Sequence, residues 1–253
     1  MAEPRRLFAP SLPAAGGEVR LPPDAAHHAR VVRLAPGDAV FLFDGRGYGA
    51  RGHVERMDGE AVVCRVQGAR EVDPVPGEAV LVLATPKAGK LDGIVRMATE
   101  AGVAAVRLVA TERTVGRPEP KRAEARMERL RRVAREAARQ AGRADVPELE
   151  APGALEAVVA RAPADALRLM ADPGAAGSIA EAVTDRTRPV WIAVGPEGGF
   201  SAAERAWLAA QGFAGVRLGP HVLRVETAAP VAVALVMDRL GAERGPARHD
   251  RTR

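Results

Sequence analysis

The chain has 253 residues, of which 47% are hydrophobic and only 3% aromatic, so Ala, Val and Leu are expected to fill the core and wide aromatic stacking platforms are not expected. Lys and Arg exceed Asp and Glu by five and the isoelectric point is about 10.2, which favours a polyanionic partner. The single cysteine, Cys64, excludes a disulfide framework and a cysteine zinc site. Neither a membrane span nor a signal-peptide core is recognisable, so we expect a cytoplasmic protein.

Short β-like runs dominate the N-terminal part of the chain. They cover residues 39–43, 49–56 and 61–67, and turn signals such as Pro36-Gly37 and Asp58-Gly59 separate them. This pattern predicts a small β-barrel. His27 and His28 have no metal-ligand companions at useful spacing, so we expect a helix-surface or core role for them. Two prolines and a glycine within residues 71–77 predict a domain boundary near residue 75.

Two glycine-containing segments imitate nucleotide-binding motifs. The run FLFDGRGYG at residues 41–49 resembles a Rossmann-type strand and glycine loop, but strand-like alternation follows it where a helix is required. It therefore predicts a hairpin turn. Gly89-Lys90 suggests a phosphate loop, yet Ala84 takes the place of the first glycine and Leu91 that of the Ser or Thr. The sequence thus excludes a nucleotide triphosphatase.

Beyond residue 75, apolar runs alternate with helical patterns. Strands are predicted at residues 79–84, 105–109, 166–171, 190–194 and 215–218, and helices at 88–101, 121–141, 178–184, 202–211 and 227–240. Such alternation predicts a mostly parallel sheet that helices cover on both faces. The fold class is therefore α/β.

A glycine-rich turn follows the fourth of these strands. Residues 195–200 read GPEGGF, and Ser201 with Glu204 has the spacing of a capping box, so a helix is expected to start there. Glycines between a buried strand and a helix allow backbone groups to approach a ligand closely. A merely tight turn would need fewer glycines. The turn therefore predicts a ligand site.

A second polar segment follows the last strand. Gly219 and Pro220 end the strand, and Thr227 is a candidate cap for the last helix, with Pro230 in its first turn. Arg224 and Glu226 are then expected in a loop beside the glycine turn. The alternative is an exposed ion pair of little energetic value.

Positive charge is concentrated between residues 113 and 143. This segment holds eleven Lys or Arg and four Glu, and the spacing of Met127, Leu130, Val133, Ala134 and Ala137 predicts an amphipathic helix with a basic outer face. A solvated surface is one interpretation and RNA contact is the other.

Four segments together resemble the RsmE family of SPOUT-class RNA methyltransferases. They are GPEGGF at 195–200, LG-x-x-x-LR-x-ETA at 218–228, EAARQ at 136–140 and ATEAGV at 98–103. Arg5-Arg6-Leu7-Phe8 and residues 27–32 also resemble the N-terminal module of that family. The resemblance implies a PUA-like, RNA-binding β-barrel at residues 1–74 and an α/β SPOUT domain with a C-terminal trefoil knot at 75–253.

The resemblance also implies a homodimer that uses S-adenosylmethionine, without a metal or a membrane, to methylate N3 of a specific uridine of 16S rRNA in the small ribosomal subunit. The cofactor would be bound by Gly195, Pro196, Glu197, Gly198, Gly199, Leu218, Gly219, Val222, Leu223, Arg224 and Thr227. Arg224 would stabilise the uracil anion, and Glu226 or Glu197 would accept the N3 proton. RNA would be bound by Arg5, Arg6, Arg113, Arg129, Arg132, Glu136 and Gln140.

Two other functions stay open at this point. One is a SPOUT ribose 2′-O-methyltransferase, which needs no proton removal from a base. The other is a PUA-like RNA-binding protein without catalytic activity.

Overall fold

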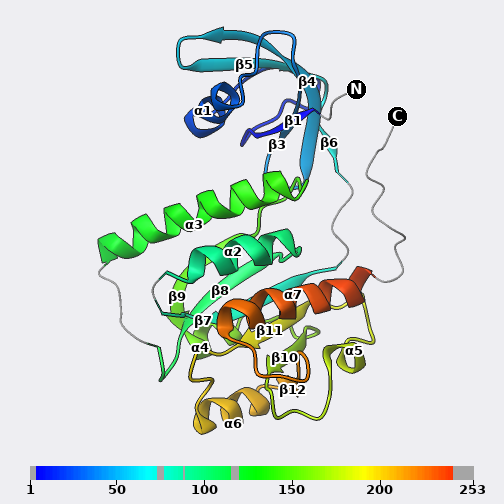
Figure 1. The fold of residues 1–253 in the computed structure, drawn as a ribbon. Coiled ribbons are helices and arrows are strands. Elements are labelled where there is room, and N and C mark those ends of the chain that lie inside the picture. The colour runs from blue at the N-terminus through cyan, green and yellow to red at the C-terminus, as the bar shows by residue number, and fades with distance from the viewer. Residues whose placement is uncertain (1–3, 73–76, 88, 115–119, 242–253) are drawn as a thin grey trace. The chain divides into compact units, whose positions relative to one another are not determined.

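A computed structural model describes residues 4–72, 77–87, 89–114 and 120–241 (Figure 1). These residues form two compact units. The first comprises residues 4–72 together with Arg135–Val146, and the second comprises residues 77–134 and 147–241. The segment Arg135–Val146 therefore packs with the N-terminal residues, although it lies in the middle of the chain.

The first unit is built on a six-stranded sheet with one short helix. Its elements are β1 (Arg5–Phe8), β2 (Gly17–Arg20), α1 (Pro23–Val31), β3 (Ala39–Phe43), β4 (Tyr48–Asp58), β5 (Ala61–Val66) and β6 (Arg70–Glu71). The strand order is β1-β3-β4-β5-β2, and β6 pairs with β4. Cys64 is fully buried in β5, and burial raises the pKa of its thiol to about 11.

The predicted hairpin turn at residues 41–49 is confirmed. β3 and β4 pair antiparallel, with Phe43 opposite Gly49. Between them the buried Asp44 accepts hydrogen bonds from the backbone N–H groups of Arg46 and Tyr48, at 2.7 and 3.1 Å. Gly47 has φ +100°, which favours glycine at the tip of the turn. This glycine run therefore shapes a turn of the first unit.

The second unit contains a six-stranded sheet whose strands all pair parallel. The strands are β7 (Ala79–Ala84), β8 (Ala105–Ala110), β9 (Glu148–Ala154), β10 (Leu167–Ala171), β11 (Val190–Val194) and β12 (Ala214–Val216). Their order is β12-β10-β11-β7-β8-β9. All residues of β7 and β11 are buried, as expected for central strands with helices on both faces. The predicted parallel sheet is confirmed.

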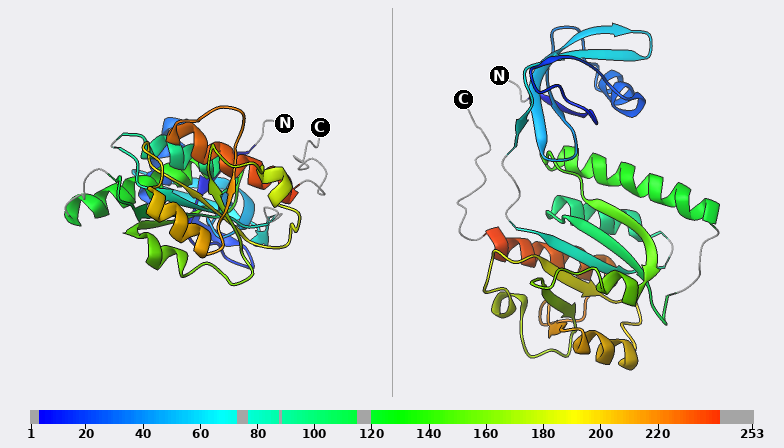
Figure 2. Two further views of the ribbon diagram at one scale, coloured as in Figure 1. Left: turned by 90° about the horizontal axis from the view of Figure 1, so that it is seen from below. Right: turned by 180° about the vertical axis from the view of Figure 1, so that it is seen from behind.

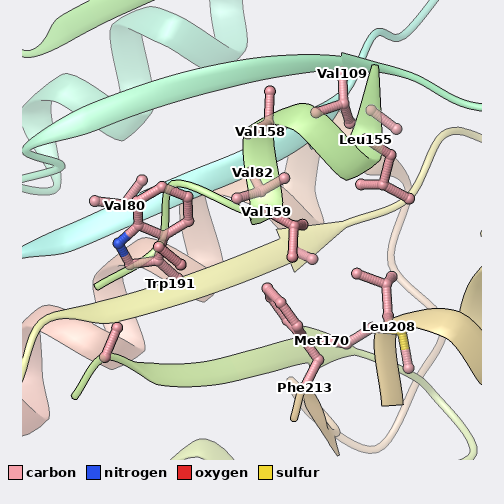
Figure 3. Packing of buried hydrophobic residues seen from close by; sticks show 14 of the residues in the cluster. Val80, Val82, Val109, Leu155, Val158, Val159, Met170, Trp191, Leu208 and Phe213 are labelled. Carbon is pink, nitrogen blue, oxygen red and sulfur yellow. The ribbon is translucent and has the colours of Figure 1, made fainter. Parts of the chain in front are cut away.

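Helices cover both faces of this sheet (Figures 1 and 2). The helices of the second unit are α2 (Leu91–Glu100), α4 (Leu155–Val159), α5 (Ile179–Ala182), α6 (Ala202–Ala210) and α7 (Val225–Gly241), whereas α3 (Pro120–Gln140) continues from the second unit into the first. α7 packs on β7 and β11 and also contacts α2 and α5. On the other face, α4 and α6 close a core in which Trp191 and Val80 lie beside each other (Figure 3). This core is mostly aliphatic, as the composition predicts.

Several short elements were not predicted, and the start of the last helix was misplaced. β9 and α4 were not predicted, because residues 148–154 are half-exposed, polar and interrupted by a proline at the edge of the sheet. In the first unit, β1, β2, β6 and α1 were missed because each is short. The last helix starts at Val225 and not at 227, since the carbonyl of Arg224 accepts the backbone N–H groups of Thr227 and Ala228. Thr227 is therefore not a cap, Glu226 lies in the helix, and Pro230 is beyond the first turn.

Candidate functional site

The two central strands send the chain in opposite directions. From β7 the chain runs through α2 to β8 on one side, and from β11 it runs through α6 to β12 on the other side. β7 and β11 are direct neighbours, with Leu83 opposite Val194 at their carboxyl ends. Ligands of open α/β sheets bind outside the carboxyl ends of strands at such a switch point. A ligand site is therefore expected at the segments that follow β7 and β11.

The glycine turn after β11 is tightly constrained by its own backbone. A Cβ atom on Gly195 would lie 2.9 Å from the backbone N of Phe200, so no larger residue fits without a shift of the chain. Gly199 has φ +68°, and its N–H donates to the carbonyl of Pro196 at 2.8 Å. Pro196 is buried, whereas Glu197 and Gly198 are exposed at the tip. The turn therefore presents backbone groups and one carboxylate outward.

The predicted capping box is confirmed and has a second function. Ser201 Oγ accepts the N–H of Glu204 at 3.1 Å, and Glu204 Oε2 accepts the N–H of Ser201 at 2.7 Å. The other carboxylate oxygen of Glu204 accepts the N–H of Glu112 at 2.8 Å. One side chain thus joins the start of α6 to the segment that follows β8.

Arg113 lies on the same glycine turn. Its guanidinium Nη1 donates to the carbonyl of Gly198, and a Cβ atom on Gly198 would lie 3.1 Å from Arg113 Cδ. Arg113 was predicted to bind RNA. In this structure it contacts the loop that was predicted to bind the cofactor, which gives it a structural role there.

The segment from Arg217 to Glu226 completes the carboxyl edge. Leu218, Gly219 and Leu223 are half-buried, whereas Arg224 and Thr227 are exposed. Val222 is 79% exposed, although it is apolar. Glu226 lies in the first turn of α7, where the helix dipole favours an anion.

Lys90 brings Glu197 and Glu226 together. Its Nζ is 3.0 Å from Glu197 Oε1 and 3.0 Å from Glu226 Oε2. The backbone N–H of Lys87 also donates to Glu197 Oε1, at 3.3 Å. Two of the three predicted catalytic residues are thus joined through a residue that sequence reasoning had dismissed with the false phosphate loop. Its one signal was a cation at a helix N-terminus.

Hydrogen bonds hold both carboxylates in the ionised form. The pKa of Glu226 is lowered by a hydrogen bond from its own backbone and by Lys90. For Glu197, desolvation raises the pKa, but hydrogen bonds from its own backbone, Lys90 and Lys87 outweigh it and leave the pKa lowered. The pKa of Lys90 is raised by both carboxylates. The group therefore carries two negative charges and one positive charge at neutral pH.

The residues predicted to bind RNA differ in their availability. Arg5, Arg129 and Arg132 are exposed, but Arg129 is paired with Asp92 at 2.5 Å. Arg6 donates to the carbonyl of Arg143 at 2.9 Å and lies 4.4 Å from the ring centroid of Phe41. Glu136 binds Arg139 through two hydrogen bonds and accepts another from Gln140 at 3.2 Å. The side chain of Glu136 is therefore occupied within the first unit.

The described residues contain no group of three or more His, Cys, Asp or Glu side chains that could hold a metal ion. None of the helices in the described ranges is long and apolar enough to cross a membrane.

The double role of Glu204 leads to a stability prediction. Ser201→Ala removes one cap and should lower the free energy of unfolding by about 1 kcal/mol. Glu204→Ala should cost more, about 2–3 kcal/mol, because the N–H groups of Ser201 and Glu112 both lose their acceptor. Chemical denaturation measures both values.

Ser178→Ala is the matched control, since it removes the capping box of the four-residue α5. Its effect should be smaller than that of Ser201→Ala. An equal cost for Ser201→Ala and Glu204→Ala would show that the bond to Glu112 contributes nothing.

Comparisons with known proteins agree with this architecture. A family model described as an RNA methyltransferase domain matches residues 73–237, and one described as an RNA methyltransferase PUA domain matches residues 21–67. Proteins named ribosomal RNA small subunit methyltransferase E are similar along most of their length. The Mycobacterium bovis protein is 34% identical over 91% of this chain and 90% of its own, and the Synechocystis protein is 30% identical over 82% and 68%.

Solved structures of methyltransferases are also similar to this chain over most of its length. Ribosomal RNA small subunit methyltransferase E from Neisseria gonorrhoeae, bound to S-adenosylmethionine, superposes with a TM-score of 0.86 at 25% identity and covers 94% of this chain and 98% of its own. A methyltransferase from Legionella pneumophila with bound S-adenosylmethionine gives 0.84 at 28%, covering 93% and 97%. The chain therefore belongs to the ribosomal RNA small subunit methyltransferase E family of RNA methyltransferases.

Proposed function

We propose that this protein methylates N3 of uridine 1498 of 16S rRNA, within the small ribosomal subunit, with S-adenosylmethionine as methyl donor. The observation that carries the proposal is the position of the GPEGGF turn, which lies at the switch point between β7 and β11 in a chain of this family. Relatives named for the small-subunit rRNA and structures solved with S-adenosylmethionine support it. A ribosomal substrate also implies a cytoplasmic protein.

The residues at the carboxyl edge fit the cofactor. Gly195 allows the turn to close tightly on its own backbone, which a side chain would prevent, and two ionised carboxylates suit a ligand with a sulfonium and an ammonium group. When bound, the cofactor supplies an electrophilic methyl group. Residues proposed to hold it are Gly195, Pro196, Glu197, Gly198, Gly199, Leu218, Gly219, Val222, Leu223, Arg224 and Thr227.

The protein must position the base and manage one proton. N3 of uridine carries a proton that must be removed, and negative charge develops on the uracil ring to the extent that its removal runs ahead of methyl transfer. The exposed guanidinium of Arg224 is proposed to stabilise that charge at O2 or O4. Glu226 or Glu197 is proposed to accept the proton, directly or through water, since both are held ionised.

Methylation of isolated components tests the proposal. The protein is incubated with unmodified small subunits and labelled S-adenosylmethionine, and the product should be a single N3-methyluridine. A methyl group on ribose O2′ would identify a ribose methyltransferase instead. Failure to bind the cofactor in calorimetry would indicate an RNA-binding protein without catalytic activity.

Gly195→Ala tests the proposed cofactor site, with Gly47→Ala as its control. The added Cβ would meet the backbone of Phe200, and strain of this kind should weaken cofactor binding by about 10- to 100-fold. In Gly47→Ala nothing lies within 4 Å of the new Cβ, and the hairpin belongs to the first unit. That variant should bind the cofactor with unchanged affinity, whatever it does to stability. The reverse result would refute the proposed cofactor site.

RNA binding is proposed to be largely electrostatic and to use the basic face of α3. Arg129→Ala with Arg132→Ala should flatten the plot of log K against log salt concentration by about 1.4–1.8, because each phosphate contact contributes about 0.7–0.9 to its slope. Arg129 also forms an exposed ion pair with Asp92, but such a pair is weak, so Asp92 competes little with a phosphate for Arg129.

Arg161→Ala with Arg188→Ala is the matched control, since it removes the same charge from residues that precede β10 and β11 at the amino edge of the sheet. It should leave the slope unchanged. If both double variants give the wild-type slope while RNA still binds, the basic face is only a solvated surface.

A homodimer is proposed to bring the RNA-binding unit of one subunit to the cofactor loops of the other, where a base flipped out of the rRNA can enter. The trefoil knot stays a prediction from the family resemblance. The exposed part of α7 supports association, because Leu235 is 36% exposed beside Ala234 while Ala229, Ala232, Val233 and Val236 are buried. Ultracentrifugation should give a dimer at micromolar concentration, and a stable monomer would exclude the composite site.

A further inference from the structure

Lys90 links three segments that are far apart in the sequence. Its ammonium group lies 3.0 Å from a carboxylate oxygen of Glu197 and 3.0 Å from one of Glu226. The three side chains are 31%, 27% and 31% exposed, so each is accessible to solvent over part of its surface. We propose that Lys90 is a positioning residue for methyl transfer, which fixes the glycine turn against the first turn of α7 and orients both carboxylates. The inference rests on the function proposed above.

The position of Lys90 is unfavourable for α2 itself. Lys90 is the N-cap residue of this helix, its side chain makes no capping hydrogen bond, and its backbone is already helical, with φ −89° and ψ −27°. Lys is not among the residues favoured at an N-cap, and a cation opposes the helix dipole at this end. A residue that is unfavourable for its own helix, with no stabilising contact inside that helix, is expected at a functional site. The gain here is the contact with the two carboxylates.

The charges around each carboxylate define what Lys90 contributes. Glu197 faces Lys90 and the backbone N–H of Lys87, and Glu226 faces Lys90 and Arg224. The pKa of each carboxylate lies below its ordinary value, so both are ionised when the pH is above that lowered pKa. Removal of the Lys90 charge raises both pKa values, although the other contacts remain. The ionised form is then lost at a higher pH than in the wild type.

Substitution of Lys90 tests the inference through kinetics. Lys90→Met keeps the length of the side chain and removes its charge, and kcat should fall by about 10- to 100-fold with little change in KM for the RNA. The acid limb of the pH profile of kcat should move to higher pH. Lys90→Arg keeps the charge and should restore the position of the limb and most of kcat.

Lys87→Met is the matched control for the loss of one lysine charge from the same loop. Only the backbone of Lys87 contacts Glu197, and its side chain is exposed. This variant should leave the acid limb at its wild-type position. An equal displacement in both variants would mean that the net charge of the loop, and not the bridge, sets the profile, and the inference would be wrong.

Lys90→Ser separates positioning from folding. Serine removes the cation that opposes the helix dipole and loses only partly exposed ion pairs, so the melting temperature should change little while kcat falls as in Lys90→Met. Wild-type kcat in either variant would overturn the inference, and so would an activity loss that follows a lowered melting temperature with an unmoved acid limb. If the wild type neither binds S-adenosylmethionine nor methylates small subunits, the proposed function fails, which is a separate result.

Discussion

The opposite directions in which β7 and β11 send the chain are the constraint on which the site depends. Because these strands are parallel neighbours and their connections diverge, the loops that follow them start side by side at the same carboxyl edge and then separate. Lys90 enters this edge from the β7 side and Glu197 from the β11 side. α7 then returns to pack on both strands and presents Glu226 from its first turn. The topology alone thus brings together residues that are up to 136 positions apart.

The same edge is held by side chains that bond to backbone groups. Glu204 accepts the N–H groups of Ser201 and Glu112, and Arg113 donates to the carbonyl of Gly198. A loop carrying three glycines would otherwise retain much conformational freedom, which a ligand would have to restrict on binding. These contacts restrict the turn before any ligand arrives. The precision of the site therefore comes from α6 and from the segment after β8 as much as from the turn itself.

Sequence patterns predicted the elements whose signals are local. The buried runs of β7 and β11 and the capping box of Ser201 with Glu204 needed only neighbouring residues to be recognised. β9 was missed because an exposed edge strand has neither an apolar run nor a clean alternation. The start of α7 was misplaced because the carbonyl of Arg224, and not a side chain, begins the helix. Lys90 was missed because its partners come from two distant segments, which periodicity does not connect.

Formal charge overstates how much of α3 is available to a polyanion. Arg129, Arg131, Arg135 and Arg139 each pair with a carboxylate, whereas Arg126 and Arg132 have no ion-pair partner among the described residues. The pairs are not equivalent, because the Arg129 side chain is 67% exposed and that of Arg139 only 14%. An exposed pair is worth little and a phosphate can replace its carboxylate, but Arg139 would have to leave a bidentate partner and a largely buried position. The surface that α3 offers to a polyanion is therefore centred on Arg126, Arg129 and Arg132, while Glu136 and Arg139 hold the end of the helix in the first unit.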